Sequence, residues 1–75
     1  MKPLYRGDIV DDGSAHRAIV RKISSEGRAL IQIRGDCTWV DAAAVRWTGC
    51  VVASRLPRTE RGWRKLGQAV ADTCS

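Results

Sequence analysis

Residues 17–40, RAIVRKISSEGRALIQIRGDCTWV, decide the fold of this chain. Two turn signals divide the stretch: Ser24-Ser25-Glu26-Gly27 is typical of a four-residue hairpin connection, and Gly35-Asp36 of a two-residue turn. The runs between them are rich in Ile, Val and Trp, which favour strands. We therefore predict a three-stranded antiparallel meander with strands at residues 17–23, 28–34 and 37–40.

The two turns also predict which side chains share a face of this meander. Folding about them places Val20 opposite Ile31, and Ile31 opposite Val40. One face then carries apolar side chains throughout: Ala18, Val20, Ala29, Ile31, Ile33 and Val40. We predict that this face forms the core.

The opposite face mixes large apolar side chains with polar ones. Its polar members are Arg21, Gln32 and Arg34. Its apolar members form a candidate protein interface: Ile19, Ile23, Leu30 and Trp39. So much apolar surface on one face requires either a cover or a partner.

The flanking sequence adds two more strands and a helix. Residues 5–10 and 50–56 are the expected first and fifth strands, and Asp41 is the expected N-cap of a short turn over residues 42–45. After Pro57, apolar residues recur with the period of a helix: Trp63, Leu66, Val70 and Cys74. Thr59 is the expected N-cap of this amphipathic helix, which we expect to pack on the sheet or on a partner chain.

The segment 5–49 resembles the Src-homology-three-like (SH3-like) small barrels of the KOW and Tudor type. Four short motifs carry the resemblance: Gly7-Asp8-Ile9-Val10, Ala18-Ile19-Val20, Ala29-Leu30-Ile31 and Trp39-Val40-Asp41-Ala42. Small phage and plasmid proteins often show this order. The resemblance implies a mostly β fold: a five-stranded SH3-like barrel over residues 1–56 and a short C-terminal α-helix within residues 57–75. It also implies a binding module, with ligands in the family that range from RNA and DNA to peptides.

One enzyme type is built on a similar barrel, the plasmid-borne type II dihydrofolate reductases, which form a tetramer around a central pore. The nearest match here is Ala29-Leu30-Ile31-Gln32-Ile33, but Arg34 follows it and no Tyr. We therefore carry over no catalytic residue.

Groups able to do chemistry are few. The single histidine, His16, has only neighbouring loop residues as possible partners, and the carboxylates Asp8, Asp11 and Asp12 are typical of solvated turns. The three cysteines form no CxxC pair, which argues against a zinc site and against a disulfide framework. We predict no catalytic residue, no metal site and no cofactor. The two Arg-Gly-Asp tripeptides, at residues 6–8 and 34–36, are expected to be turns rather than adhesion motifs.

Hydropathy favours a cytoplasmic protein. No apolar run approaches the ~18 residues of a membrane span, and no apolar core of a signal peptide follows the first residues. We expect no membrane partner.

The charge distribution suggests the ligand. The net charge is +5, with five basic residues and one acidic residue in 13–35, and five basic and two acidic in 51–75. Such a surface favours nucleic acid or an acidic protein. The candidate nucleic-acid-binding residues are Arg17, Arg21, Lys22, Arg28, Arg34, Arg46, Trp47, Arg61, Arg64 and Lys65. We predict a non-catalytic module that contacts phosphates; the alternative is a protein-interaction module or small inhibitor or adaptor from a mobile element, and a homodimer fits either.

Overall fold

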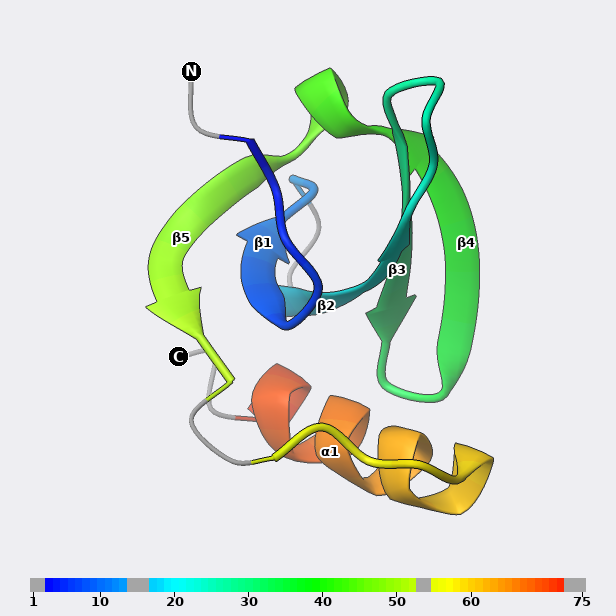
Figure 1. The fold of residues 1–75 in the computed structure, drawn as a ribbon. Coiled ribbons are helices and arrows are strands. Elements are labelled where there is room, and N and C mark those ends of the chain that lie inside the picture. Colours follow the sequence, from blue (N-terminus) through cyan, green and yellow to red (C-terminus); the bar gives the residue numbers. More distant parts are fainter. Residues whose placement is uncertain (1–2, 14–16, 53–54, 73–75) are drawn as a thin grey trace.

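The computed structural model describes residues 3–13, 17–52 and 55–72 of the chain. Within them, one antiparallel sheet and one α-helix form the fold, and a 3-10 turn precedes the last strand (Figure 1). The elements are β1 Asp8–Asp11, β2 Arg17–Ile23, β3 Arg28–Ile33, β4 Asp36–Asp41, η1 Ala42–Ala44, β5 Arg46–Val51 and α1 Glu60–Asp72. The mostly β class with a C-terminal helix is confirmed.

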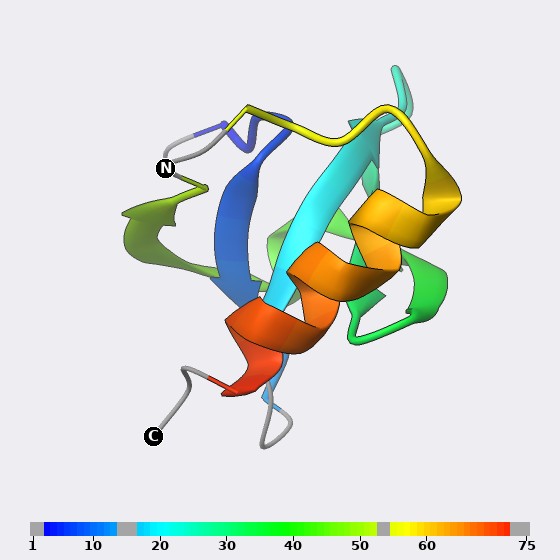
Figure 2. The same cartoon turned by 90° about the horizontal axis from the view of Figure 1, so that it is seen from below.

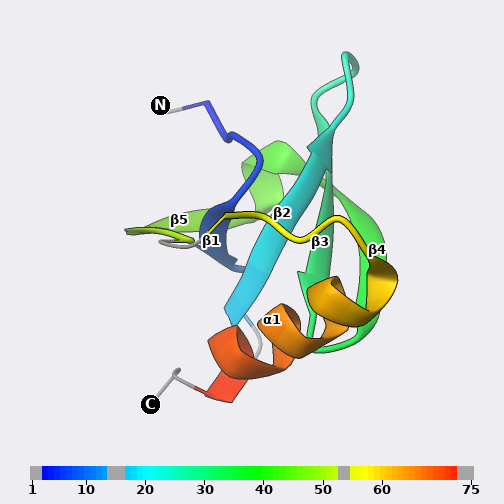
Figure 3. The ribbon, with the colours of Figure 1, turned by 60° about the horizontal axis from the view of Figure 1, so that its bottom comes forward.

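The sheet is open and does not close into the five-stranded SH3-like barrel that the sequence suggests. Its strand order is β4-β3-β2-β1-β5, and in the described part of the chain β4 and β5 are its two edges. Closure would require the last strand to reach β4. Instead the chain leaves β5, and residues 55–59 cross the outer face of the sheet to reach the start of α1 (Figure 3).

The predicted register of the meander is confirmed at its centre and shifted at one end. Val20 lies opposite Ile31, as predicted. In the second hairpin, however, Ile31 lies opposite Thr38, and Val40 lies opposite Ala29. The turn is therefore Arg34-Gly35 instead of Gly35-Asp36, with Arg34 at a positive φ of 57°. The shift is two residues, the side-chain period of a strand, so the residues of β3 and β4 keep their predicted faces.

A β-bulge in β2 changes the outer face. The register shifts between Val20 and Lys22, which leaves Arg21 as the extra residue and places Lys22, not Arg21, opposite Leu30. Beyond the bulge, Ile23 lies opposite Ala29, a core residue. Ile23 therefore belongs to the inner face, and its predicted place beside Trp39 on the outer face is wrong.

Glycines set the bounds of the first and last strands, so β1 is shorter than predicted and β5 lies earlier in the chain than predicted. Gly7 has a φ of 94° in a turn closed by a hydrogen bond from the Asp8 amide to the Tyr5 carbonyl, 3.1 Å, so β1 begins at Asp8 rather than at residue 5. Gly49 has a φ of 89° and lies inside β5 at a register shift opposite Ile9 and Val10. The observed strand β5 runs through this glycine, and it therefore lies earlier in the chain than the predicted range of 50–56.

The inner face forms the main core. Val10, Ala18, Val20, Ala29 and Ile31 are fully buried there. Partly buried side chains close the rim of this core: Leu4, Ile33, Val40 and Val45. All six residues of the predicted core face are in these two sets, so the core prediction is confirmed.

The helix α1 covers part of the outer face and builds a second core. It lies across β2 and β3 (Figure 2). Ile19, Trp63 and Val70 are buried between helix and sheet. Thr59 caps the helix as predicted, since its hydroxyl accepts a hydrogen bond from the Gly62 amide at 3.1 Å. The helix thus packs on the sheet of its own chain.

Candidate nucleic-acid interface

Trp63 anchors α1 to the sheet. Its side chain is only 4% exposed and packs with Ile19 and Val70. The guanidinium of Arg21 lies over its ring, 4.5 Å from the centroid, and that of Arg6 lies 5.8 Å away. A cation over an indole face stabilises by roughly 0.5–2 kcal/mol, more when water is excluded. The helix is therefore held both by apolar burial and by two guanidinium contacts to one ring.

Arg21 also forms an ion pair with the first turn of the helix. Its guanidinium donates to both Glu60 carboxylate oxygens, at 2.9 and 3.4 Å, and to the Cys37 sulfur at 3.2 Å. The hydrogen bond from Arg21 lowers the pKa of the Glu60 carboxylate, and the same bond raises the pKa of the Arg21 guanidinium. The Arg21 side chain is 13% exposed. Arg21 therefore helps to dock the helix, and its contact with nucleic acid stays a prediction.

Gln32 and Gly67 bring the helix backbone against the turn between β3 and β4. The Gln32 amide nitrogen donates to the Trp63 carbonyl at 2.6 Å and to the Arg34 carbonyl at 2.5 Å, and the side chain is buried. A Cβ on Gly67 would stand 2.0 Å from the Arg34 carbonyl oxygen. Only glycine permits this approach, which fixes the helix relative to Arg34.

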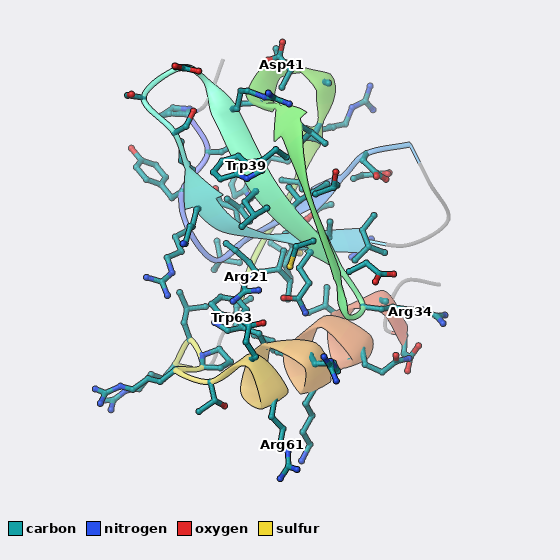
Figure 4. The ribbon with its side chains drawn as sticks, turned by 90° about the vertical axis from the view of Figure 1, so that its right-hand side faces the viewer. Arg21, Arg34, Trp39, Asp41, Arg61 and Trp63 are labelled. Atoms are coloured by element: carbon teal, nitrogen blue, oxygen red, sulfur yellow. The ribbon has the colours of Figure 1, made fainter. Side chains whose placement is uncertain are left out.

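Three basic side chains lie on the outer face of α1, and a fourth joins them from the turn between β3 and β4. Arg61, Arg64 and Lys65 are exposed at i, i+3 and i+4 of the helix, a spacing that places them on one side. The stem of Arg64 lies over Gly35, where a Cβ would be 3.3 Å from the Arg64 Cγ. Arg34, next to that glycine, is exposed (Figure 4). We call Arg34, Arg61, Arg64 and Lys65 the helix basic surface.

The carboxylates beside the helix basic surface already have cationic or amide partners. Glu60 is held by Arg21. Asp72 lies 4.0 Å from Arg34 and accepts hydrogen bonds from the Gln68 amide at 3.0 Å. The local charge balance therefore remains positive, and the ion pairs among the described residues leave Arg61, Arg64 and Lys65 available to an external anion.

A shallow hollow of about 470 Å³ lies on this face. It is lined by Arg61, Arg64, Lys65, Gln68, Ala69 and Asp72. All of these residues come from one helix, so the walls of the hollow are long side chains and not packed backbone. The hollow suits an extended charged surface better than an enclosed small molecule.

Arg17, Arg46 and Trp47 lie away from the helix basic surface. Arg17 and Arg46 are both direct cross-strand neighbours of Asp11, one on each side of β1. Trp47 is partly exposed on β5, where its indole nitrogen donates to the Cys50 carbonyl at 3.1 Å. The structure thus places Arg46 and Trp47 on β5, at the opposite edge of the sheet from β4, and Arg17 on the central strand β2.

Lys22 and Arg28 form a third location. Lys22 is opposite Leu30 on the outer face, and Leu30 is opposite Trp39. The Arg28 guanidinium donates to the Trp39 carbonyl at 3.5 Å. Of the ten predicted nucleic-acid residues, the structure therefore brings together the four of the helix basic surface. Arg21 and Lys22 lie close enough to the first turn of α1 to act on the Glu60 carboxylate.

The structure divides the candidate protein interface. Ile19 is fully buried beneath α1, and Ile23 is 43% exposed near the end of β2, on the other side of the sheet from Trp39. Leu30 is half-buried, and Trp39 is 44% exposed. The outer-face row that remains consists of Lys22, Leu30 and Trp39, next to the open edge of the sheet at β4.

The part of the chain that the structure describes contains no group of three His, Cys, Asp or Glu side chains placed to hold a metal ion. His16 and Cys74 lie outside the described residues. Both Arg-Gly-Asp tripeptides are at turns, as predicted. No α-helix among the described residues has the length and apolar character needed to cross a membrane.

Sequence reasoning missed the residues that position the helix. The pattern identifies Gln32 only as a polar residue on a solvated face, and it predicts no contact for Arg6. Gly67 did carry a signal, because a glycine inside the apolar stripe of a helix costs about 1 kcal/mol in helix propensity and so needs a packing reason. That reason is the backbone contact with Arg34.

Comparisons with protein-family models, with curated proteins and with solved structures found no match to this chain. Function must therefore be inferred from the side chains themselves. Their arrangement places exposed cationic groups along one side of a docked helix.

Proposed function

We propose that this chain is a non-catalytic module that binds nucleic acid by contacting phosphates through the helix basic surface. The observation that carries the proposal is the convergence of Arg34, Arg61, Arg64 and Lys65, from two elements that Gly67 holds in contact. Three of the four are arginines, whose planar guanidinium suits bidentate contact with phosphate oxygens. Because the helix is docked, these groups are partly ordered before the ligand arrives, which lowers the entropy cost of binding.

The resemblance to SH3-like binding modules supports the same conclusion. The strand meander and the 3-10 turn η1 before β5 are features of such small barrels, and Asp41 caps that turn by accepting from the Ala43 amide at 3.0 Å. In this proposal the chain is an open member of that architecture, with α1 laid on its outer face. Fold alone does not fix the ligand, so the basic side chains carry the functional argument.

The proposal predicts a defined salt dependence. Four phosphate contacts give a slope of log K against log salt of about −3.6 for duplex DNA, which is a loss of roughly 150-fold between 50 and 200 mM salt. The assay is fluorescence anisotropy with a labelled mixed-sequence duplex at both salt concentrations. The mass of the protein in solution should be measured alongside, because a homodimer would double the number of contacts.

A charge-matched pair of variants locates the site. The double variant Arg61→Glu, Arg64→Glu should lose at least tenfold more affinity than Lys22→Glu, Arg28→Glu, which changes the net charge equally outside the helix basic surface. Thermal unfolding should show both variants folded. Equal losses in the two variants would mean that only the net charge matters, and the helix basic surface would be refuted as the site.

A second candidate function is protein recognition, and one observation favours it. Trp39 is 44% exposed beside Leu30 on the edge strand β4. Exposed tryptophans rimmed by basic groups are typical of binding hot spots. If no nucleic acid binds at 50 mM salt, this surface becomes the leading candidate.

A further inference from the structure

We propose that the preferred ligand is B-form duplex DNA, bound without sequence preference, with α1 in or along the major groove. This inference rests on the proposed function and specifies its ligand. It depends on three features of the helix basic surface. These are the absence of an exposed aromatic ring on α1, the spacing of the cations along α1, and the hydrogen bonds that Gln68 donates.

The first feature argues against single strands. Proteins that bind single strands stack bases on exposed aromatic rings, at about 1–3 kcal/mol for each base. The aromatic residue of α1 is Trp63, which is buried with Arg21 over its ring. The exposed aromatic side chains of the described residues are on other elements: Tyr5 before β1, Trp39 on β4 and Trp47 on β5. In Figure 4, Trp39 and Arg61 are on opposite sides of the sheet-helix interface. A strand lying on the helix basic surface would therefore gain phosphate contacts but no stacking.

The second feature fits a duplex groove. Arg61 lies near the start of α1, and Arg34 marks its other end, because Arg34 is 4.0 Å from Asp72. Along a helix this separation is about 16 Å at 1.5 Å per residue. The major groove of B-form DNA is about 12 Å wide and admits a helix, so α1 lying along the groove brings its spaced cations to the phosphates that border it. The major groove of double-stranded RNA is deep and narrow and excludes a helix.

The third feature argues against readout of adenine. The outer face of α1 carries one amide side chain, Gln68, and glutamine reads adenine by using its donor and acceptor together. The Gln68 nitrogen already donates to both oxygens of Asp72, at 3.0 Å each. This interaction competes with adenine, and Ala69 beside it has no polar atom on its side chain. Arginine and lysine also read guanine edges; in this proposal Arg61, Arg64 and Lys65 bind phosphates instead, which carry no sequence information.

The test compares four labelled probes in the same anisotropy assay at 50 mM salt. They are a 20-base-pair mixed DNA duplex, a second duplex of scrambled sequence, the separated strands of the first, and the RNA duplex of the same sequence. We expect the two DNA duplexes to bind equally within about twofold, and at least fivefold more tightly than the single strands or the RNA duplex. The Arg61→Glu, Arg64→Glu variant should lose this preference.

The outcomes separate this inference from the proposed function. Tighter binding of single strands, or equal binding of the RNA duplex, would overturn the inference; if the Arg61→Glu, Arg64→Glu variant still weakened that binding, the proposed function would stand. A strong difference between the two DNA sequences would overturn the absence of base readout. Failure of all four probes to bind at 50 mM salt would overturn both proposals.

Discussion

Replacing Gly67 by alanine tests how the helix is positioned. A Cβ at this position would stand 2.0 Å from the Arg34 carbonyl oxygen, 2.4 Å from the Gln32 amide nitrogen and 3.0 Å from the Arg34 carbonyl carbon. The two closest atoms cannot move away cheaply. One is backbone, and the other is held by hydrogen bonds to the Trp63 and Arg34 carbonyls. The helix must therefore shift outward and strain or break the Gln32 contacts.

The magnitude follows from three opposing effects. Overpacking costs about 1–3 kcal/mol, and a buried amide that loses its partners costs about 1–3 kcal/mol. Alanine instead of glycine inside a helix returns about 1 kcal/mol. We expect Gly67→Ala to lower the free energy of unfolding by about 2 kcal/mol or more, which for a domain of this size lowers Tm by about 10 °C.

The assay is urea unfolding followed by tryptophan fluorescence and circular dichroism. The control is the reverse exchange at an exposed helix position, Ala69→Gly, which should cost only about 1 kcal/mol through helix propensity. The close contact predicts that Gly67→Ala lowers the free energy of unfolding, whereas helix propensity alone predicts that it raises it. If Gly67→Ala were as stable as the wild type or more stable, propensity alone would govern position 67, and the close contact between helix and turn would be refuted.

Two further predictions concern the same docking contacts. Gln32→Leu should lower the free energy of unfolding by about 1–3 kcal/mol, because the Trp63 and Arg34 carbonyls lose a buried donor; urea unfolding measures this, and an unchanged midpoint would contradict it. Glu60 has a pKa lowered below its ordinary value of 4.5 by Arg21, so its contribution to stability is present above pH 4.5 and is lost as the pH falls through the lower pKa of the folded state. Glu60→Gln should therefore remove part of the loss of Tm between about pH 5 and pH 3, and equal pH profiles for wild type and variant would refute the ion pair.

The core could be predicted from sequence because the turns and the alternation of apolar residues agree. The predicted turn was displaced, yet Ile31 and Val40 remained on the inner face, since a shift of two residues preserves the face. An error of one residue would have inverted the whole assignment. Such tolerance explains why the core was right although the hairpin was not.

The bulge at Arg21 could not be predicted from local sequence. Its stabilising contacts are with Glu60 and Trp63, and Glu60 is 39 residues away in the chain. The bulge also turns Ile23 to the inner face, away from Trp39. Local propensity contains no information on either contact, because both exist only after α1 docks.

The candidate site was predictable in part. The helical period alone is enough to place Arg61, Arg64 and Lys65 on one exposed face. The addition of Arg34 depends on the close approach at Gly67, a tertiary contact. The contacts of Arg21 have the same origin, since the docked helix supplies Glu60 and Trp63.

The most direct test of the central claim is to map the surface that duplex DNA contacts. Backbone amide chemical shifts of the isotopically labelled protein should be followed while a mixed-sequence DNA duplex is added at 50 mM salt. We predict that the largest shifts fall at Arg34, Arg61, Arg64 and Lys65. Shifts confined to β5, or to the row of Lys22, Leu30 and Trp39, would contradict the account, as would a spectrum that DNA leaves unchanged.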